Sequence, residues 1–293
     1  MTFDLASLEG AIDALASSGR AARFMRAGDG EASVPGLRTV ASTRAGELYE
    51  GDQNNVEAFV LAPAPTPRGY RMLLCATQGN EKGTSTAVAG AIAVLEIARA
   101  ARDGRSGRGA LARAAKQIAD LSKHGPAVPS GRFYSSASGE IRTLRGLGTS
   151  VIALELDGPS AEVAHLGECT AFLVRDGEAR CIARPHTLAR VAEETGDEKL
   201  RAHLAEDPWT ADVVTAVLGG DREPEIMELD ARPGDTFVVC TARPGRLGPR
   251  RIAECVVPDP AETLRQILAA APENPQSYGV TVIVARVAGF SSR

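Results

Sequence analysis

Apolar residues recur with a helical period in several segments of the chain. The pattern is strongest over residues 84–102, where Thr84 or Ser85 can cap the start and the stretch DGRSGRG follows the end. Leu5, Leu8 and Ile12 begin a similar repeat near the N-terminus. The spacing predicts helices over residues 4–26, 84–102, 111–122, 186–205, 250–256 and 261–271.

Shorter apolar or alternating runs predict strands. Asp157-Gly158 and Asp176-Gly177 link two pairs of runs, and the stretch APAPTPRG links another pair, as in β-hairpins. We expect strands at 58–62, 70–76, 150–156, 161–165, 170–174, 179–182, 225–229, 236–241 and 280–287. Because the helices interrupt the strands without alternating regularly with them, the order disfavours a parallel doubly wound sheet. It predicts an α+β fold of two antiparallel sheets packed face to face, with helices outside.

The stretch AGDGEASVPG interrupts the first helical pattern. It therefore predicts a helical appendage at residues 1–30, followed by one main domain at residues 40–288.

The composition narrows the class of protein. Of 293 residues, 44% are hydrophobic and only 4% aromatic, so Ala, Val and Leu must fill the core. A net charge of −4 argues against broad capture of nucleic acid. No apolar stretch approaches the roughly 20 residues that span a bilayer, so we expect no membrane partner.

Five cysteines are scattered without C-x-x-C spacing, which predicts buried, reduced thiols. Their odd number, and an N-terminus that does not read as a targeting segment, favour a cytoplasmic location.

Several short motifs follow one another in a particular order. NNVEAFVLA and LLCATQGNEKG come first, then GTS, GECTAF, RDG and PHT, and finally MELDARPGDTFVVCTARPG and NPQSYGVTVIVARV. This order resembles that of the PP2C-like (PPM) metal-dependent Ser/Thr phosphatases over residues 40–288. The resemblance implies an α/β/β/α sandwich. In active members of that family, aspartates hold two Mg²⁺ or Mn²⁺ ions, and a water that bridges them attacks phosphorus.

The chain departs from the family pattern at the positions that would hold the metal ions. Those positions and their neighbours are Glu57, Gln78, Gly79, Thr241, Ala242, Arg243 and Tyr278. Only one carboxylate remains among them, whereas two closely spaced dications repel by something on the order of tens of kcal/mol at low dielectric. We therefore expect no metal, no cofactor and no catalytic residue, as in a pseudophosphatase.

The same positions have other possible roles. Glu57 is either a relict metal ligand or a hydrogen-bonded acid at a strand edge. Gln78 either lines a binding pocket or satisfies backbone groups of the turn. Tyr278 either fills the space left by the metals or stacks on a ligand or partner.

Arginines and histidines are two further candidate groups. The stretch TARPGRLGPRR carries arginines suited to binding phosphate, or else it is a solvated basic loop. His186 matches a family position away from the metals and is interpreted as structural. His124, His165 and His203 are too scattered to suggest zinc.

The leading hypothesis is a non-catalytic regulatory protein. It would bind a protein partner, such as a phosphoprotein or kinase, through the degenerate site or the N-terminal helix. An alternative is an active phosphatase whose metal site recruits Glu50, Asp52 or Glu81. A third is an assembly subunit without a ligand.

Overall fold

The expected strands form two antiparallel sheets. The computed structural model describes residues 28–44, 57–66, 69–79, 84–124, 147–272 and 279–289. Sheet A has the order β1-β2-β11-β10-β7-β8, and sheet B has the order β3-β4-β5-β6-β9. The strands are β1 (Gly28–Val34), β2 (Leu37–Arg44), β3 (Ala58–Thr66), β4 (Gly69–Gln78), β5 (Ser150–Asp157), β6 (Ser160–Leu166), β7 (Thr170–Arg175), β8 (Glu178–Ala183), β9 (Glu225–Asp230), β10 (Thr236–Cys240) and β11 (Val280–Val287).

Apolar side chains on both faces of the central strands explain their continuous hydrophobic runs. In β4, Met72 and Leu74 point into the core between the sheets, whereas Leu73 and Cys75 point toward helices. Successive side chains of a strand alternate between its faces, so a strand buried on both sides has no polar face. The sheets therefore occupy the middle layers of the fold.

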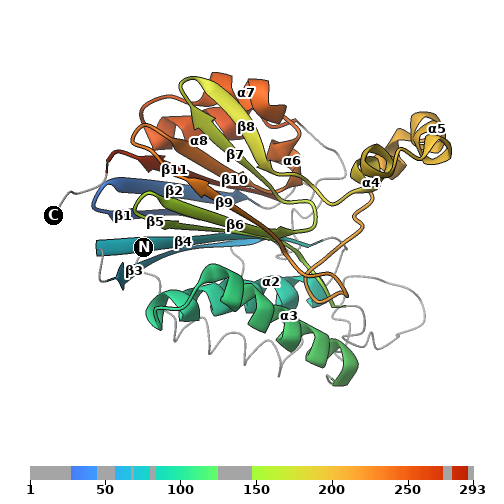
Figure 1. Cartoon of the computed structure of the whole chain (residues 1–293), viewed down its shortest axis with the longest axis horizontal. Coiled ribbons are helices and arrows are strands. Elements are labelled where there is room, and N and C mark those ends of the chain that lie inside the picture. Colours follow the sequence, from blue (N-terminus) through green and yellow to red (C-terminus); the bar gives the residue numbers. More distant parts are fainter. Residues whose placement is uncertain are drawn as a thin grey trace.

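Two pairs of helices form the outer layers (Figure 1). Helices α2 (Thr84–Arg102) and α3 (Gly107–His124) cover sheet B, and α7 (Gly248–Cys255) and α8 (Pro260–Ala270) cover sheet A. The predicted α+β sandwich with helices outside is confirmed.

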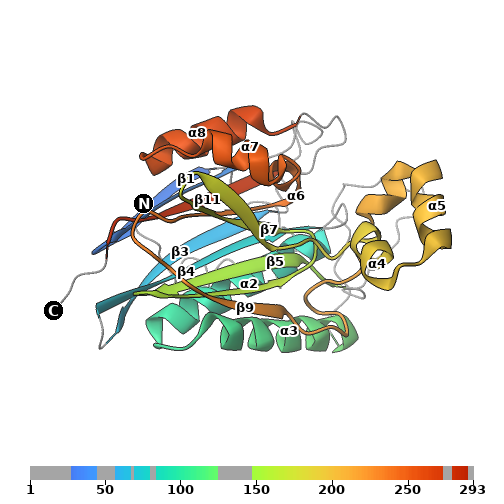
Figure 2. The same cartoon turned by 45° about the horizontal axis from the view of Figure 1, so that its top comes forward.

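A short helical arm projects from one end of the sandwich (Figure 2). It consists of α4 (Leu188–Thr195) and α5 (Glu198–Glu206), followed by a 3₁₀ turn, η3 (Pro208–Asp212). The single helix predicted for this region is wrong. Gly196 adopts a left-handed conformation with φ 68°, which ends α4. The Asp197 side chain then caps the start of α5, because it accepts hydrogen bonds from two backbone N–H groups there.

The first described strands were missed by the sequence prediction. Gly28–Val34 lies in β1, although its sequence GDGEASV reads as a break between elements. Among the described strands, β1 pairs with β2 alone, at the edge of sheet A, so pairing rather than apolar content defines it. Sheet A thus begins before residue 40. The predicted helix at 4–26 lies outside the described residues. Short helix α6 (Ala242–Gly245) was not predicted either.

Cysteine burial agrees with the prediction. All five cysteines are free thiols, and only Cys181 is partly exposed. In the described part of the chain, no helix is both long and apolar enough to cross a membrane.

Phe237 provides a test of the core between the sheets. It is fully buried there, on β10 opposite Leu173 and Ala285. We expect Phe237→Ala to lower the free energy of unfolding by about 3–5 kcal/mol, because it leaves a cavity. Urea denaturation followed by circular dichroism measures this change. The control Met227→Ala, at a side chain that is 38% exposed, should change stability by less than about 0.5 kcal/mol. Equal losses in both variants would contradict the assigned core.

Candidate functional site

The residues expected at the degenerate site meet where strands from both sheets end. Glu57 directly precedes β3, Gln78 ends β4, and Thr241 follows β10. Antiparallel pairing of β3 with β4, and of β10 with β11, places the start of one strand beside the end of its neighbour. Segments far apart in the sequence therefore share one edge of the sandwich.

Gln78 holds this edge together through both ends of its amide. Its Nε2 donates to Glu168 Oε1 at 2.6 Å, and its Oε1 accepts the backbone N–H of Ala242 at 2.7 Å. The side chain is almost fully buried, since Gln78 is only 2% exposed. Its backbone carbonyl accepts a hydrogen bond from Thr149 Oγ1 at 3.0 Å. The side chain thus satisfies a backbone group, at the start of α6 rather than in its own turn.

Glu57 lies fully buried between two threonines. Its Oε2 accepts hydrogen bonds from Thr281 Oγ1 at 2.9 Å and from Thr241 Oγ1 at 3.3 Å. Burial raises the pKa of Glu57 to about 8, and the two hydroxyl hydrogen bonds offset only part of that effect. Near neutral pH this carboxyl therefore holds a proton most of the time.

Glu168 is a second carboxyl of the site, and the sequence analysis did not name it. It lies between β6 and β7 and is 9% exposed. Burial raises the pKa of Glu168 to about 7, while the charge of Arg246 acts to lower it. The residue belongs to the motif GECTAF, so the carboxylate within that motif is the sequence signal that points to it.

Gly167 fixes the backbone beside this second carboxyl. Its φ is 100°, and a Cβ at this position would lie 2.7 Å from Cα of Ser150. The Glu168 N–H donates to Ser150 Oγ at 3.0 Å. A glycine is therefore required for this close approach of two backbones.

Two arginines lie at the rim of the site. Arg243 donates from Nε to the Pro272 carbonyl, and its charge opposes a small part of the burial-driven rise in the pKa of Glu57. Arg246 forms an ion pair with Asp212 at 2.8 Å, and its side chain is 43% exposed. The site therefore combines two buried carboxyls, whose pKa values are raised by burial, with cationic groups near the solvent.

The other two arginines of the predicted basic stretch do not join the site. Arg250 and Arg251 are exposed on α7, and both contact Glu254 on the same helix. The predicted four-arginine group is thus divided between the site rim and a separate solvated surface.

Of the remaining predicted positions, the structure describes one and leaves the others outside the described residues. Gly79 is buried directly after β4. Tyr278 lies outside the described residues, and so do Glu50, Asp52 and Glu81 of the alternative metal site.

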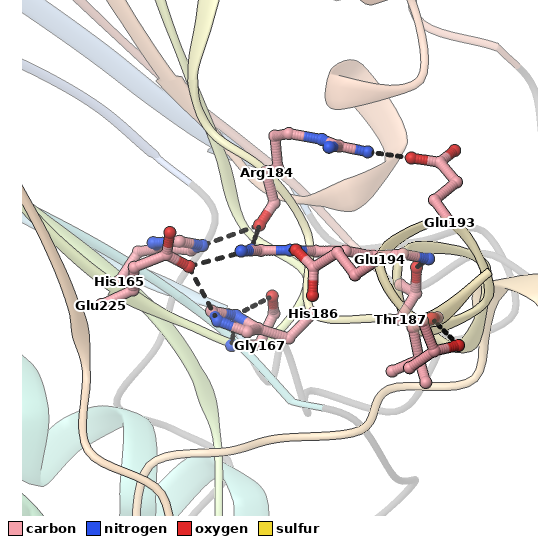
Figure 3. Close-up of polar contacts among 11 residues, drawn as sticks. His165, Gly167, Arg184, His186, Thr187, Glu193, Glu194 and Glu225 are labelled. Atoms are coloured by element: carbon pink, nitrogen blue, oxygen red, sulfur yellow. Dashed lines mark hydrogen bonds and ion pairs between the residues drawn. The ribbon is translucent and has the colours of Figure 1, made fainter.

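A separate cluster gathers His165, one of the three histidines too scattered in the sequence to suggest zinc, and His186, interpreted from the sequence as structural. His165 on β6 stacks on His186, with ring centroids 4.5 Å apart, and His186 Nε2 lies 3.2 Å from Glu225 Oε2 (Figure 3). Burial lowers the pKa of His165 to about 4 and also lowers that of His186, so both rings are neutral near pH 7. The pairing of β6 with β9 places His165 opposite Glu225, and a hydrogen bond from the His186 backbone N–H to the Gly167 carbonyl brings His186 alongside. Sequence spacing shows neither contact.

Comparison with solved structures identifies the fold. The crystal structure of the Mycobacterium tuberculosis serine/threonine phosphatase PstP/Ppp superposes with a TM-score of 0.66 at 22% identity, covering 86% of this chain and 98% of that one. The chain has the PP2C-like fold.

Other solved structures with this fold carry ions or ligands. The catalytic domain of PstP in complex with 2 manganese ions matches with a TM-score of 0.62 at 22% identity, covering 85% of this chain and 97% of that one. The PPM Ser-Thr phosphatase MsPP from Mycobacterium smegmatis, in complex with cacodylate, matches with a TM-score of 0.59 at 22% identity, covering 87% and 100% of the two chains.

Sequence comparison gives a partial match to the same kind of protein. The serine/threonine protein phosphatase PstP of Mycobacterium tuberculosis is 27% identical over 176 residues, or 58% of this chain. The match spans 34% of that relative's length. No protein-family model matches the chain.

The raised pKa values of the site predict how stability depends on pH. The folded state binds the Glu57 proton more tightly than the unfolded state does, because burial raises the pKa of this carboxyl from 4.5 to about 8. The free energy of unfolding therefore falls as the pH rises between these two values. Below pH 6.5 the two buried histidines act in the opposite sense, so the net fall should be clearest between pH 6.5 and 8.

The variant Glu57→Gln isolates the contribution of one carboxyl. The slope of unfolding free energy against pH should become less negative by up to about 1.4 kcal/mol per pH unit. Urea denaturation at several pH values between 5 and 9 measures it. Glu178→Gln, at an exposed position on β8, serves as the control and should leave the slope unchanged. An unaltered slope in Glu57→Gln would show that Glu57 is ionised when folded.

Proposed function

We propose that this protein is a non-catalytic member of the PP2C-like group that binds a protein partner through its degenerate site. The observation that carries the proposal is the position of Gln78. A neutral amide stands where the family resemblance implies a metal-binding aspartate, and both ends of that amide are hydrogen-bonded within the protein.

The described donor set does not fit a centre of two dications. Mg²⁺ and Mn²⁺ need several anionic oxygens, and two ions close together need more. The described part of the site offers Glu57 and Glu168, and burial favours the protonated form of both. Ala242 brings no ligand atom in its side chain, and Arg243 adds positive charge.

The arginines at the rim suit a phosphorylated partner. A phosphoryl group carries a charge of about −1.5 to −2 and accepts several hydrogen bonds from guanidinium groups. Arg246 is partly exposed, and Asp212 opposite it is more exposed still, so an incoming phosphoryl group can replace this carboxylate as its partner. Capture of phosphate without hydrolysis would make the protein a reader or regulator of phosphorylated segments.

An active phosphatase with a rearranged metal site is the second candidate. The observation that favours it is the convergence of two carboxyls, Glu57 and Glu168, on the same edge. A dication that bound there would displace their protons. The similarity to PstP adds weight to this candidate.

Hydrolysis of p-nitrophenyl phosphate with excess Mn²⁺ separates the two candidates. We expect no metal-dependent turnover, and no binding of two Mn²⁺ ions in isothermal titration. The double variant Gln78→Asp/Ala242→Asp should bind Mn²⁺ at least tenfold more tightly, because it supplies the missing charge. The control Val213→Asp/Met227→Asp adds the same charge at exposed positions and should have no effect. Robust turnover by the natural chain would overturn the proposal and support the second candidate.

Binding of a phosphoserine peptide tests the role of the rim. We expect fluorescence anisotropy to show tighter binding of the phosphorylated peptide than of its unphosphorylated form. Arg246→Ala should weaken binding about tenfold, through loss of a charge-assisted hydrogen bond. Arg250→Ala removes the same charge from a side chain that is 95% exposed on α7 and should leave affinity unchanged. Equal effects of the two substitutions would point to unspecific attraction.

A further inference from the structure

The group His165, His186 and Glu225, here termed the His–Glu cluster, has a ligand set that the degenerate site lacks. One candidate ligand atom from each residue lies within 4.8 Å of the other two. Among the described residues, no other group of three histidine, cysteine or acidic side chains meets this criterion. The side chains come from three segments: the end of β6, the loop after β8 and the start of β9 (Figure 3).

Hydrogen bonds orient both imidazoles for coordination. His165 Nε2 lies 2.8 Å from the Arg184 carbonyl, which can only accept, so this nitrogen carries the proton and Nδ1 has the lone pair. His186 Nδ1 lies 3.3 Å from the carbonyl and 3.2 Å from the N–H of Gly167. Gly167 can therefore serve either tautomer, including the one that leaves Nε2 free to bind a metal. A backbone carbonyl that fixes the second ring nitrogen is the usual support of a metal-bound histidine.

The distance between two of the ligand atoms fits a small tetrahedral ion. His186 Nε2 and Glu225 Oε2 are 3.2 Å apart. Ligands about 2.0–2.1 Å from a tetrahedral zinc ion are separated by roughly 3.3 Å. The third ligand atom, on His165, must come closer, because the three ligand atoms are spread over up to 4.8 Å and the stacked rings, 4.5 Å apart and inclined by 30°, direct their lone pairs nearly side by side. The His165 ring must therefore turn toward Glu225 when an ion binds.

Arg190 is the group that a metal ion would have to accommodate. Its Nη1 lies 2.9 Å from Glu225 Oε2. It also donates to the Arg184 carbonyl and, through Nε, to Glu194. If a cation takes the Glu225 oxygen, Arg190 thus keeps two partners, and Glu194 still balances its charge.

We propose that the His–Glu cluster binds one divalent cation of the zinc class, with His165 Nδ1, His186 Nε2 and a Glu225 carboxylate oxygen as ligands and water in the remaining position. Two imidazoles and one carboxylate select zinc-type ions over Mg²⁺ or Mn²⁺. The ion would join β6, β9 and the loop that leads into α4. It would therefore fix the base of the helical arm.

Titration of the full chain with Zn²⁺ tests the site directly. We expect one ion to bind per chain, and Zn²⁺ to raise the melting temperature where Mg²⁺ at the same concentration does not. His165→Ala and Glu225→Gln should each weaken Zn²⁺ binding at least tenfold. His203→Ala, at an exposed histidine of α5, and Cys181→Ser, at the partly exposed cysteine, should leave binding unchanged.

Cobalt gives a readout that does not depend on how the variants fold. Co²⁺ bound to the natural chain should show the intense visible absorption of a four-coordinate site, and Zn²⁺ should abolish it by displacement. Absence of one-to-one Zn²⁺ binding by the natural chain would overturn the proposal. Undiminished affinity in both His165→Ala and Glu225→Gln would do so as well. Neither result bears on Mn²⁺ at Gln78, so this proposal and the proposed function fail independently.

Discussion

The hydrogen-bonded amide of Gln78 is the constraint on which the arrangement of the site depends. It links the end of β4, in sheet B, to the backbone at the start of α6, which follows β10 of sheet A, and to the carboxyl of Glu168. A buried amide without partners would cost several kcal/mol, so these contacts fix how the strand ends meet. The same contacts occupy the amide nitrogen and oxygen of Gln78, to which a ligand or metal ion could otherwise bind.

Polar groups buried at this edge of the sandwich are stabilised in two different ways. Around Gln78, the carboxyls of Glu57 and Glu168 are favoured in their protonated forms and are bonded to neutral partners. Around His186, by contrast, an arginine and a carboxylate pair near the surface, and the rings stay neutral. Gly167 lies between the two, because it contacts His186 and directly precedes Glu168. The base of the arm and the candidate site therefore share one short backbone segment.

Much of the fold followed from local sequence patterns. The helix predicted over residues 84–102 matches α2, and the runs after residue 150 match β5 to β11, because buried strands and helices need continuous or periodic apolar residues. The failures have physical causes. Strand β1 is defined by pairing at a sheet edge, and the α4–α5 break depends on one glycine conformation. Neither the edge strand nor the helix break produces a periodic pattern of apolar residues in the sequence.

The candidate site was predictable only in part. The positions of Glu57, Gln78 and Thr241 followed from aligned motifs, and the structure places them together. The role of Glu168 and the meeting of His165 with His186 did not follow, because strand register and three-dimensional closure decide which distant side chains touch. Spacing along the chain contains no such information.

The opposite shifts of the two buried acids and the two buried histidines have a consequence for the charge of the folded molecule. The sequence gives an isoelectric point of about 5.7. Near that pH, burial keeps Glu57 and Glu168 largely uncharged, whereas their carboxyls would be mostly ionised in the unfolded chain. Burial also keeps His165 largely uncharged and lowers the pKa of His186, whereas both rings would be mostly protonated in the unfolded chain. The lost negative charge of the acids and the lost positive charge of the histidines oppose one another, so burial of these four groups changes the net charge of the molecule less than burial of either pair alone would.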